Sequence, residues 1–241
     1  MPPDLLESIL AAPDDDLPRL IAADWFEENG EPDRAEFIRV QIERARLASS
    51  STFSSSFPAD DERTRLSLVA REKVLLHKHG ERWLAPLRQR GEALQHRGTH
   101  GQFVRGFVEV VWMPAAMFWR RGEKLFARTP ARELKVTRMS MDDLILLTHI
   151  PVCQRLVSLD LSGLNLTQLV PYGERIWGDA FSHLRRLSLV NCNLGDAGAE
   201  MIRMYPWREP LERLDVSRNP LSQQAIDLLV QRFGDAVLFH R

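Results

Sequence analysis

The chain has few cysteines, no long apolar run and no excess of charge of either sign. Its 2 cysteines among 241 residues fit a reduced compartment and exclude a disulfide-stabilised scaffold. It has no stretch of about 18 apolar residues that could span a membrane, and its first residues lead into an amphipathic helix rather than a basic and apolar leader. A formal net charge of −1 disfavours general binding to nucleic acid or to an anionic membrane. We therefore expect a soluble protein of the cytoplasm.

Leucine recurs at a fixed spacing in the second half of the chain. Three successive copies share one pattern, with Leu156, Leu159, Leu161 and Leu166, then Leu184, Leu187, Leu189 and Leu194, then Leu211, Leu214, Val216 and Leu221. The first shift, from Leu156 to Leu184, is 28 residues, and the second, from Leu184 to Leu211, is 27. The pattern L-x-x-L-x-L-x-x-(N/C)-x-L at this period is typical of leucine-rich repeats. Each copy predicts a short strand with inward leucines, followed by an outer helix.

The ninth position of the pattern predicts how neighbouring turns are joined. An asparagine or cysteine there can form hydrogen bonds with loop backbone groups that would otherwise be buried unpaired. Cys192 and Asn219 occupy this position in the second and third copies, whereas the first copy has Leu164 with Asn165 beside it. We expect looser geometry in that first turn. After the third copy, Ser222 is a good N-cap for a helix.

Weaker copies extend the array in both directions. They comprise Leu134, Val136, Met139 and Met141, then Val108 and Val110 further upstream, and a truncated last strand at 237–239. Terminal repeats must close the core rather than stack on both sides, which accounts for their degeneracy. The predicted fold class is α/β, a small leucine-rich-repeat solenoid of about five units preceded by an α-helical domain. Its parallel strands are expected near 107–112, 133–137, 158–162, 186–190 and 213–217.

The N-terminal third has helical periodicity. Helices are expected at about 5–10, over 17–29 and from 34 to about 47, with a break at 30–33. A Ser-rich stretch then predicts a linker or long loop, and a further helix runs from 62 to about 79. The predicted domains are a helical domain at 1–47, a linker at 48–60, a helical connecting region at 61–105 and the solenoid at 106–241.

A specific resemblance rests on residues 15–41, which read DDLPRLIAADWFEENGEPDRAEFIRVQ. This motif is similar to the repeat-companion domain found at the N-terminus of bacterial proteins that carry repeat arrays. Residues 105–108, which read RGFV, and the repeats after them resemble the leucine-rich arrays that accompany that domain. The resemblance implies a role in protein assemblies or regulation. It carries over no catalytic residue and names no partner.

The acidic stretch at 14–28 could be imagined as a metal or acid–base cluster. No His or Cys lies near it in the sequence, and calcium loops need a fixed alternation with a glycine turn. A helix cap and a solvated helix face are therefore the favoured interpretation. Within the stretch, we expect Trp25 to lie in the core and Asp24 to bond with Arg34, Arg39 or exposed backbone.

Two further pairs have the spacing of neighbours on a helix. His96 and His100 are too few for a zinc site, and Gly98 between them weakens the helix. His149 and Cys153 lack a third group for thiol catalysis, and Cys153 is more simply a buried residue. We therefore predict no enzymatic activity, no metal and no cofactor.

The arginines between Arg82 and Arg105 are the best candidate for contact with nucleic acid. Glu92 interrupts them, and aromatic residues occur only near the ends of the stretch, as Trp83 and Phe103. That is poor material for stacking bases, so a solvated loop is the preferred interpretation.

Side chains that alternate with the inward leucines are predicted to face solvent on the concave side of the array. This face should show Glu109, Val111, Trp112, Glu133, Lys135, Thr137, Arg138, Ser158, Asp160, Ser162, Arg186, Ser188, Val190, Asn191, Arg213, Asp215, Ser217 and Arg218. Because Trp and Arg dominate binding hot spots, the predicted partner-binding residues are Trp112, Arg138, Arg186, Arg213 and Arg218. The alternative is that the arginines only balance Asp160 and Asp215.

The sequence thus predicts a non-enzymatic adaptor or regulatory subunit that binds another protein on the concave face of the repeats. The helical hairpin near the N-terminus is a second candidate surface. Two other classes stay open, namely an enzyme with a site between the helical domain and the repeats, and a weak nucleic-acid binder that uses the Arg82 to Arg105 stretch.

Overall fold

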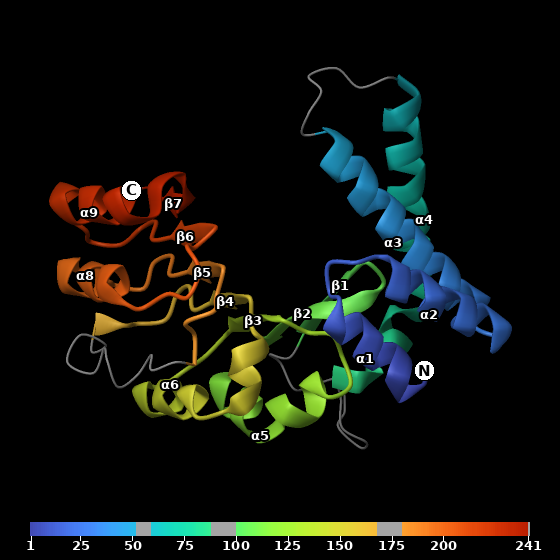
Figure 1. Cartoon of the computed structure of the whole chain (residues 1–241), viewed down its shortest axis with the longest axis horizontal. Coiled ribbons are helices and arrows are strands. Elements are labelled where there is room, and N and C mark those ends of the chain that lie inside the picture. The colour runs from blue at the N-terminus through green and yellow to red at the C-terminus, as the bar shows by residue number, and fades with distance from the viewer. Residues whose placement is uncertain (52–58, 88–99, 168–179, 241) are drawn as a thin grey trace. The chain divides into compact units, whose positions relative to one another are not determined.

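The computed structural model describes residues 1–51, 59–87, 100–167 and 180–240, which fall into two compact units (Figure 1). The helical unit comprises Met1–Ala93, Gly101–Glu109 and Arg128–Pro130. The sheet unit comprises Leu94–His100, Val110–Ala127 and Ala131–Arg241. The division passes through a single strand, between Glu109 and Val110.

The helical unit contains α1 (Pro3–Ala11), α2 (Leu17–Glu28), α3 (Pro32–Ser51) and α4 (Ala59–Trp83), followed by the short 3-10 helix η1 (Ala85–Leu87). The predicted helices are present, but α3 and α4 are longer than expected. The stretch 48–60, predicted as a linker, is therefore helical at both ends, and its middle at 52–58 lies outside the described residues. Within this stretch, the Ser49 hydroxyl donates to the Ala45 carbonyl 3.0 Å away, so its side chain bonds back to the preceding turn of the helix.

The helices α1, α2 and α3 share one apolar core. It consists of Ile9, Ala22, Ala23, Ala35, Ile38, Ile42 and Phe107, with Leu5, Leu20 and Phe26 packed against it. The Asp15 carboxylate accepts a hydrogen bond from the Leu17 amide at 2.9 Å, as expected for a helix start. Trp25 was predicted to lie in the core but is only half-buried, because Ala22 and Ala23 occupy the inner face of α2.

A β-hairpin completes the helical unit. Strand β1 (His100–Val104) is joined to β2 (Phe107–Met113) by Arg105 and Gly106, whose φ angles are 47° and 89°. Positive φ at both central residues is the geometry of a two-residue hairpin turn, so the strands are antiparallel. The segment predicted as a helical connection at 61–105 therefore ends in a strand.

The turn of this hairpin is held by side chains of the helices. Gly106 donates its amide to Gln41 Oε1 at 2.7 Å and accepts from Arg34 Nη2 at 2.6 Å. Arg105 donates to the carbonyls of Pro13 and Asp14, both at 2.9 Å. The turn is thus bound both by the residues that precede α2 in the sequence and by side chains of α3.

Two buried arginines lie beside the hairpin. Arg34 lies among the rings of Phe26, Phe37, Trp83, Phe103 and Phe107, with its guanidinium carbon 4.8 Å from the nearest ring centre, that of Trp83. Burial lowers the pKa of Arg34 to about 10, so it stays charged at neutral pH. Arg19, fully buried, places Nη2 2.7 Å from Glu109 Oε1. The prediction that Glu109 faces solvent is wrong, because it is the partner of this buried cation.

The sheet unit is built on parallel strands. After β2 come β3 (Glu133–Val136), β4 (Ser158–Asp160), β5 (Arg186–Ser188), β6 (Arg213–Asp215) and β7 (Val237–Leu238), each parallel to the one before it. With β1 they make a seven-stranded, mostly parallel sheet in the order β1-β2-β3-β4-β5-β6-β7. The predicted strand positions are confirmed, although β3, β4, β5 and β6 end one or two residues early.

Helices cover one face of this sheet, as Figure 1 shows for α8 and α9 beside β5, β6 and β7. The helical segments among the described residues of this unit are α5 (Ala115–Phe126), α6 (Met141–Thr148), η2 (Pro151–Arg155), α8 (Asp196–Met204), α9 (Gln223–Phe233) and η4 (Gly234–Ala236). As predicted, Ser222 caps α9 by accepting from the Ala225 amide at 3.2 Å. Between sheet and helices lies a buried row of register partners, Val111, Leu134, Leu159, Leu187 and Leu214. Val111 was predicted to be exposed, and the structure corrects this.

Asn219 joins two turns of the sheet unit in the way that the ninth position predicts. Its Oδ1 accepts from the amides of Cys192 and Leu194, both at 2.9 Å. Its Nδ2 donates to the carbonyls of Leu189 at 2.7 Å and Val216 at 2.9 Å. One buried side chain therefore satisfies four backbone groups that would otherwise lack partners.

We predict that Gly106→Ala destabilises the protein far more than Gly30→Ala. Both glycines have positive φ, which costs alanine about 1 kcal/mol. A Cβ at Gly106 would also lie 2.4 Å from Ile38 Cγ1 and 2.8 Å from Ile38 Cα, whereas at Gly30 it would meet nothing within 4 Å. We expect losses of about 3 and about 1 kcal/mol respectively in urea unfolding. Equal losses would show that the turn is not packed against α3 as described.

We also predict that Glu109→Ala costs about 3 to 5 kcal/mol, because it leaves the fully buried charge of Arg19 without this carboxylate. The double variant Arg19→Met with Glu109→Leu should recover most of that loss, since both charges of this buried pair are removed together. Thermal and urea unfolding of the single and double variants measure both effects. A double variant as unstable as Glu109→Ala would contradict the pairing.

Candidate functional site

The exposed face of the sheet unit carries two rows of side chains, each formed by register partners on successive strands. The first row is Val110, Glu133, Ser158, Arg186 and Arg213. The second row is Trp112, Lys135, Asp160, Ser188 and Asp215. Because side chains alternate along a strand, the buried leucine row lies between them and points the other way. The rows therefore share the face opposite the helices.

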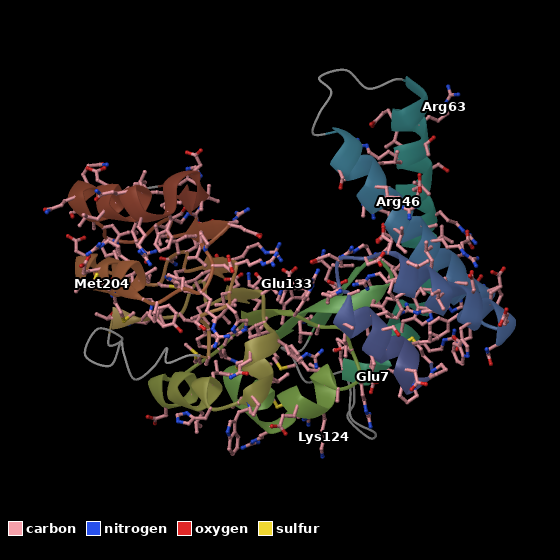
Figure 2. The ribbon with its side chains drawn as sticks, viewed as in Figure 1. Glu7, Arg46, Arg63, Lys124, Glu133 and Met204 are labelled. Carbon is pink, nitrogen blue, oxygen red and sulfur yellow. The ribbon has the colours of Figure 1, made fainter. Side chains whose placement is uncertain are left out.

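A shallow hollow of about 290 Å³ lies over these rows. Its lining includes every residue of the two rows except Asp215, together with Leu134 and Leu187 at the bottom. Figure 2 labels Glu133, which enters the hollow from β3. We refer to this region as the sheet-face hollow.

Ion pairs cross the sheet-face hollow from strand to strand. Arg186 Nη2 lies 2.8 Å from Glu133 Oε1, and the two side chains meet above Ser158, the small residue between them in the row. Lys135 Nζ lies 3.0 Å from Asp160 Oδ2 on the next strand. These pairs fix the orientation of long side chains that would otherwise be free to rotate.

The Asp160 carboxylate is anchored more firmly than its neighbours. Burial works to raise the pKa of Asp160, but hydrogen bonds from Ser162 and the ammonium group of Lys135 hold it below its usual range. Ser162 Oγ in turn lies 2.9 Å from Ser188 Oγ. The centre of the hollow is thus a connected polar network with an ionised carboxylate at neutral pH.

The structure brings together three of the five residues predicted to bind a partner. Trp112, Arg186 and Arg213 all line the sheet-face hollow. Arg213 is the most exposed of them, with 58% of its side chain accessible, and its nearest carboxylate is Asp215 at 3.5 Å. The other two, Arg138 and Arg218, are exposed on the loops that follow β3 and β6 and do not line the hollow. The φ of Arg218 is 56°, so the backbone turns away from the strand direction at this residue.

The partner-binding prediction passed over several residues that shape the hollow. Glu133, Lys135, Ser158, Asp160 and Ser188 line it, and the alternation of side chains identified them as exposed without marking them as functional. Ser217 was expected on the same face but is buried, because its hydroxyl accepts from the His240 amide at 3.1 Å.

Some of the other residues considered from the sequence contact neighbouring side chains in the structure. Asp24 and Glu27 each accept a hydrogen bond from Arg39 Nη2 at 2.6 Å, so the expected partner of Asp24 is found. The ring of His100 lies edge-on to Trp112 with centres 6.3 Å apart. His96 and most of the basic stretch, Arg88, Arg90 and Arg97, lie outside the described residues.

Comparison with known proteins identifies one repeat. A family model described as Leucine Rich repeat matches residues 182–202, which contain β5, the turn with Cys192 and most of α8. No match was found among curated proteins or among solved structures. A leucine-rich repeat is therefore shown for residues 182–202.

We predict that neither cysteine reacts with iodoacetamide in the folded protein. Burial raises the pKa of the Cys153 thiol to about 12 and that of Cys192 to about 11, so both are protonated at pH 8. Only the thiolate is nucleophilic, and we expect labelling at least about 100-fold slower than in the unfolded chain. The variant Gln223→Cys, at an exposed site on α9, supplies a reactive control. Labelling of Cys153 as fast as the introduced cysteine would instead support thiol catalysis by the pair His149 and Cys153.

Proposed function

We propose that the protein is a non-enzymatic protein-binding module, an adaptor or regulatory subunit that holds its partner in the sheet-face hollow. On this proposal the sheet unit is a small leucine-rich-repeat solenoid of about five units, and the N-terminal helices are a repeat-companion domain of the bacterial type. The observation that carries the proposal is the pair of ordered side-chain rows on the face that the helices leave open. Leucine-rich repeats commonly present such a face to other proteins.

The chemistry of the hollow suits a folded protein surface better than a small molecule. It is shallow, and charges of both signs line it, with Glu133 and Lys135 on β3, Asp160 on β4, and Arg186 and Arg213 on the next two strands. A partner with a complementary arrangement of charges could bind to these groups without leaving a buried charge unpaired. Trp112 at one end adds a large rigid ring, and Arg213 at the other adds an exposed guanidinium.

None of the helices in the described part of the chain is long and apolar enough to cross a membrane.

We predict that Arg213→Glu weakens binding of the partner. Arg213 is exposed, so the substitution should leave the fold intact while it reverses charge at the open end of the hollow. We expect at least about a tenfold loss of affinity, the size of a hot-spot effect. Affinity capture from a lysate of the source cells, followed by titration of the captured protein, measures it.

The matched control is Arg232→Glu, which reverses another exposed arginine, on α9 and on the helical side of the sheet. It should capture the partner as well as the wild type does. Equal capture by the wild type and both variants would show that the partner does not bind in the sheet-face hollow. The helical unit would then be the next surface to test. Absence of any protein partner would favour screening for an enzymatic activity instead.

A further inference from the structure

In the two rows of the open sheet face, the cations are more accessible to solvent than the carboxylates. Each of the three ion pairs along these rows has the basic side chain as its more exposed member. The exposed fractions of the side chains are 39% and 27% for Arg186 and Glu133, 44% and 26% for Lys135 and Asp160, and 58% and 15% for Arg213 and Asp215. A molecule that approaches this face therefore meets the guanidinium and ammonium groups before the carboxylates.

The length of the side chains and the bonds of the carboxylates account for this order. Both acidic residues of the second row are aspartates, and each binds the backbone two residues further on. Asp160 Oδ1 accepts from the Ser162 amide at 2.8 Å, and Asp215 Oδ1 accepts from the Ser217 amide at 3.1 Å. Lysine and arginine have longer side chains whose charged ends stay in water. The ion pairs within the chain therefore leave the cations open to a partner.

Two of the cations stand side by side. Arg186 and Arg213 are register partners on β5 and β6, and adjacent strands are about 4.8 Å apart. Arg186 uses Nη2 for Glu133, on the side away from β6, and the contact of Arg213 with Asp215 is longer, at 3.5 Å. A guanidinium has five N–H donors, so both arginines keep donors for a further carboxylate. Like charges this close repel, and an anion between them offsets that repulsion.

We propose that the partner presents an acidic segment to the sheet-face hollow, and that one of its Asp or Glu carboxylates binds between Arg186 and Arg213. This inference rests on the proposed function, since it specifies the chemistry of the partner at the same site. Three cations and two carboxylates line the hollow, so one positive charge is in excess. Lys135, in the second row, offers a contact for a neighbouring carboxylate of the same segment.

The two carboxylates in the lining favour a protein over a nucleic acid. Glu133 and Asp160 lie among the cations, so a continuous phosphate backbone would meet them as well. An acidic protein segment can place neutral side chains over these two carboxylates. Trp112, at one end of the hollow, offers such a side chain an apolar contact.

A labelled decaglutamate peptide is the first probe, and its binding is measured by fluorescence anisotropy. The wild type should bind it and should not bind decalysine. Affinity should fall at least about tenfold between about 0.1 M and 1 M salt, as the Debye length shortens from about 10 Å to about 3 Å. Arg186→Gln and Arg213→Gln should each cost about tenfold, and the double variant less than the product of the two losses, because one carboxylate serves both arginines.

Removal of a carboxylate from the hollow separates an acidic partner from one of mixed charge. Glu133→Gln keeps an oxygen that can accept from Arg186 and removes one negative charge. Affinity for decaglutamate, and for a protein captured from a lysate of the source cells, should rise about threefold. A partner that places a cation on Glu133 would instead bind more weakly. The matched control is Asp227→Asn, at an exposed site on α9, which should leave both affinities unchanged.

The outcomes distinguish this inference from the proposed function. If the wild type captures no protein, both are overturned. If a captured protein is lost with Arg213→Glu but binds Glu133→Gln more weakly, or if decaglutamate does not compete with it, the hollow binds a partner of another charge pattern and this inference alone is overturned. Loss of capture after nuclease treatment also overturns it, because the cations then serve a nucleic acid. Circular dichroism should show that every variant is folded.

Discussion

Burial of one row of apolar side chains determines the geometry of the sheet unit. Val111, Leu134, Leu159, Leu187 and Leu214 are register partners on five strands, and all are buried under the helices. A shift of one residue in any strand would exchange its inner and outer faces and expose its member of the row. The same register therefore places the two polar rows on the open face, and the sheet-face hollow follows from the packing of the leucines.

The sequence predicted the middle of this sheet well and the faces of β2 poorly, for a physical reason. From β4 to β6 the spacing of 28 and 27 residues repeats, so one assignment of inner and outer positions serves every copy. β2 lies outside the clear repeats, and both Val111 and Trp112 were assigned to the open face. Adjacent residues on a regular strand cannot share a face, and the structure buries Val111. The buried position of Glu109 depends on Arg19, 90 residues away in sequence, which no local pattern reveals.

The ion pairs of the hollow could be recognised only from the three-dimensional register. Arg186 and Glu133 are 53 positions apart in the chain and meet because β4 presents a serine between their strands. The alternative stated from the sequence, that the arginines only balance Asp160 and Asp215, is wrong for Arg186, which pairs with Glu133. This pairing does not exclude binding, because a paired side chain is already oriented and loses less freedom when a partner arrives. Arg213, at a 3.5 Å separation from Asp215, is the less restrained of the two.

In the helical unit, a buried pairing also decides what the surface presents. Glu109 of β2 pairs with Arg19 in the interior, and the arginine also donates to the Pro13 carbonyl at 2.9 Å. If Arg19 reached solvent instead, it would place a cation among the carboxylates of α2. Its withdrawal leaves α2 without an exposed cation of its own, so the carboxylates of Asp24 and Glu27 take theirs from Arg39 of α3, at 2.6 Å. The charge that α2 presents is therefore a consequence of how the hairpin is anchored, and a substitution in the core can alter it without touching the helix surface.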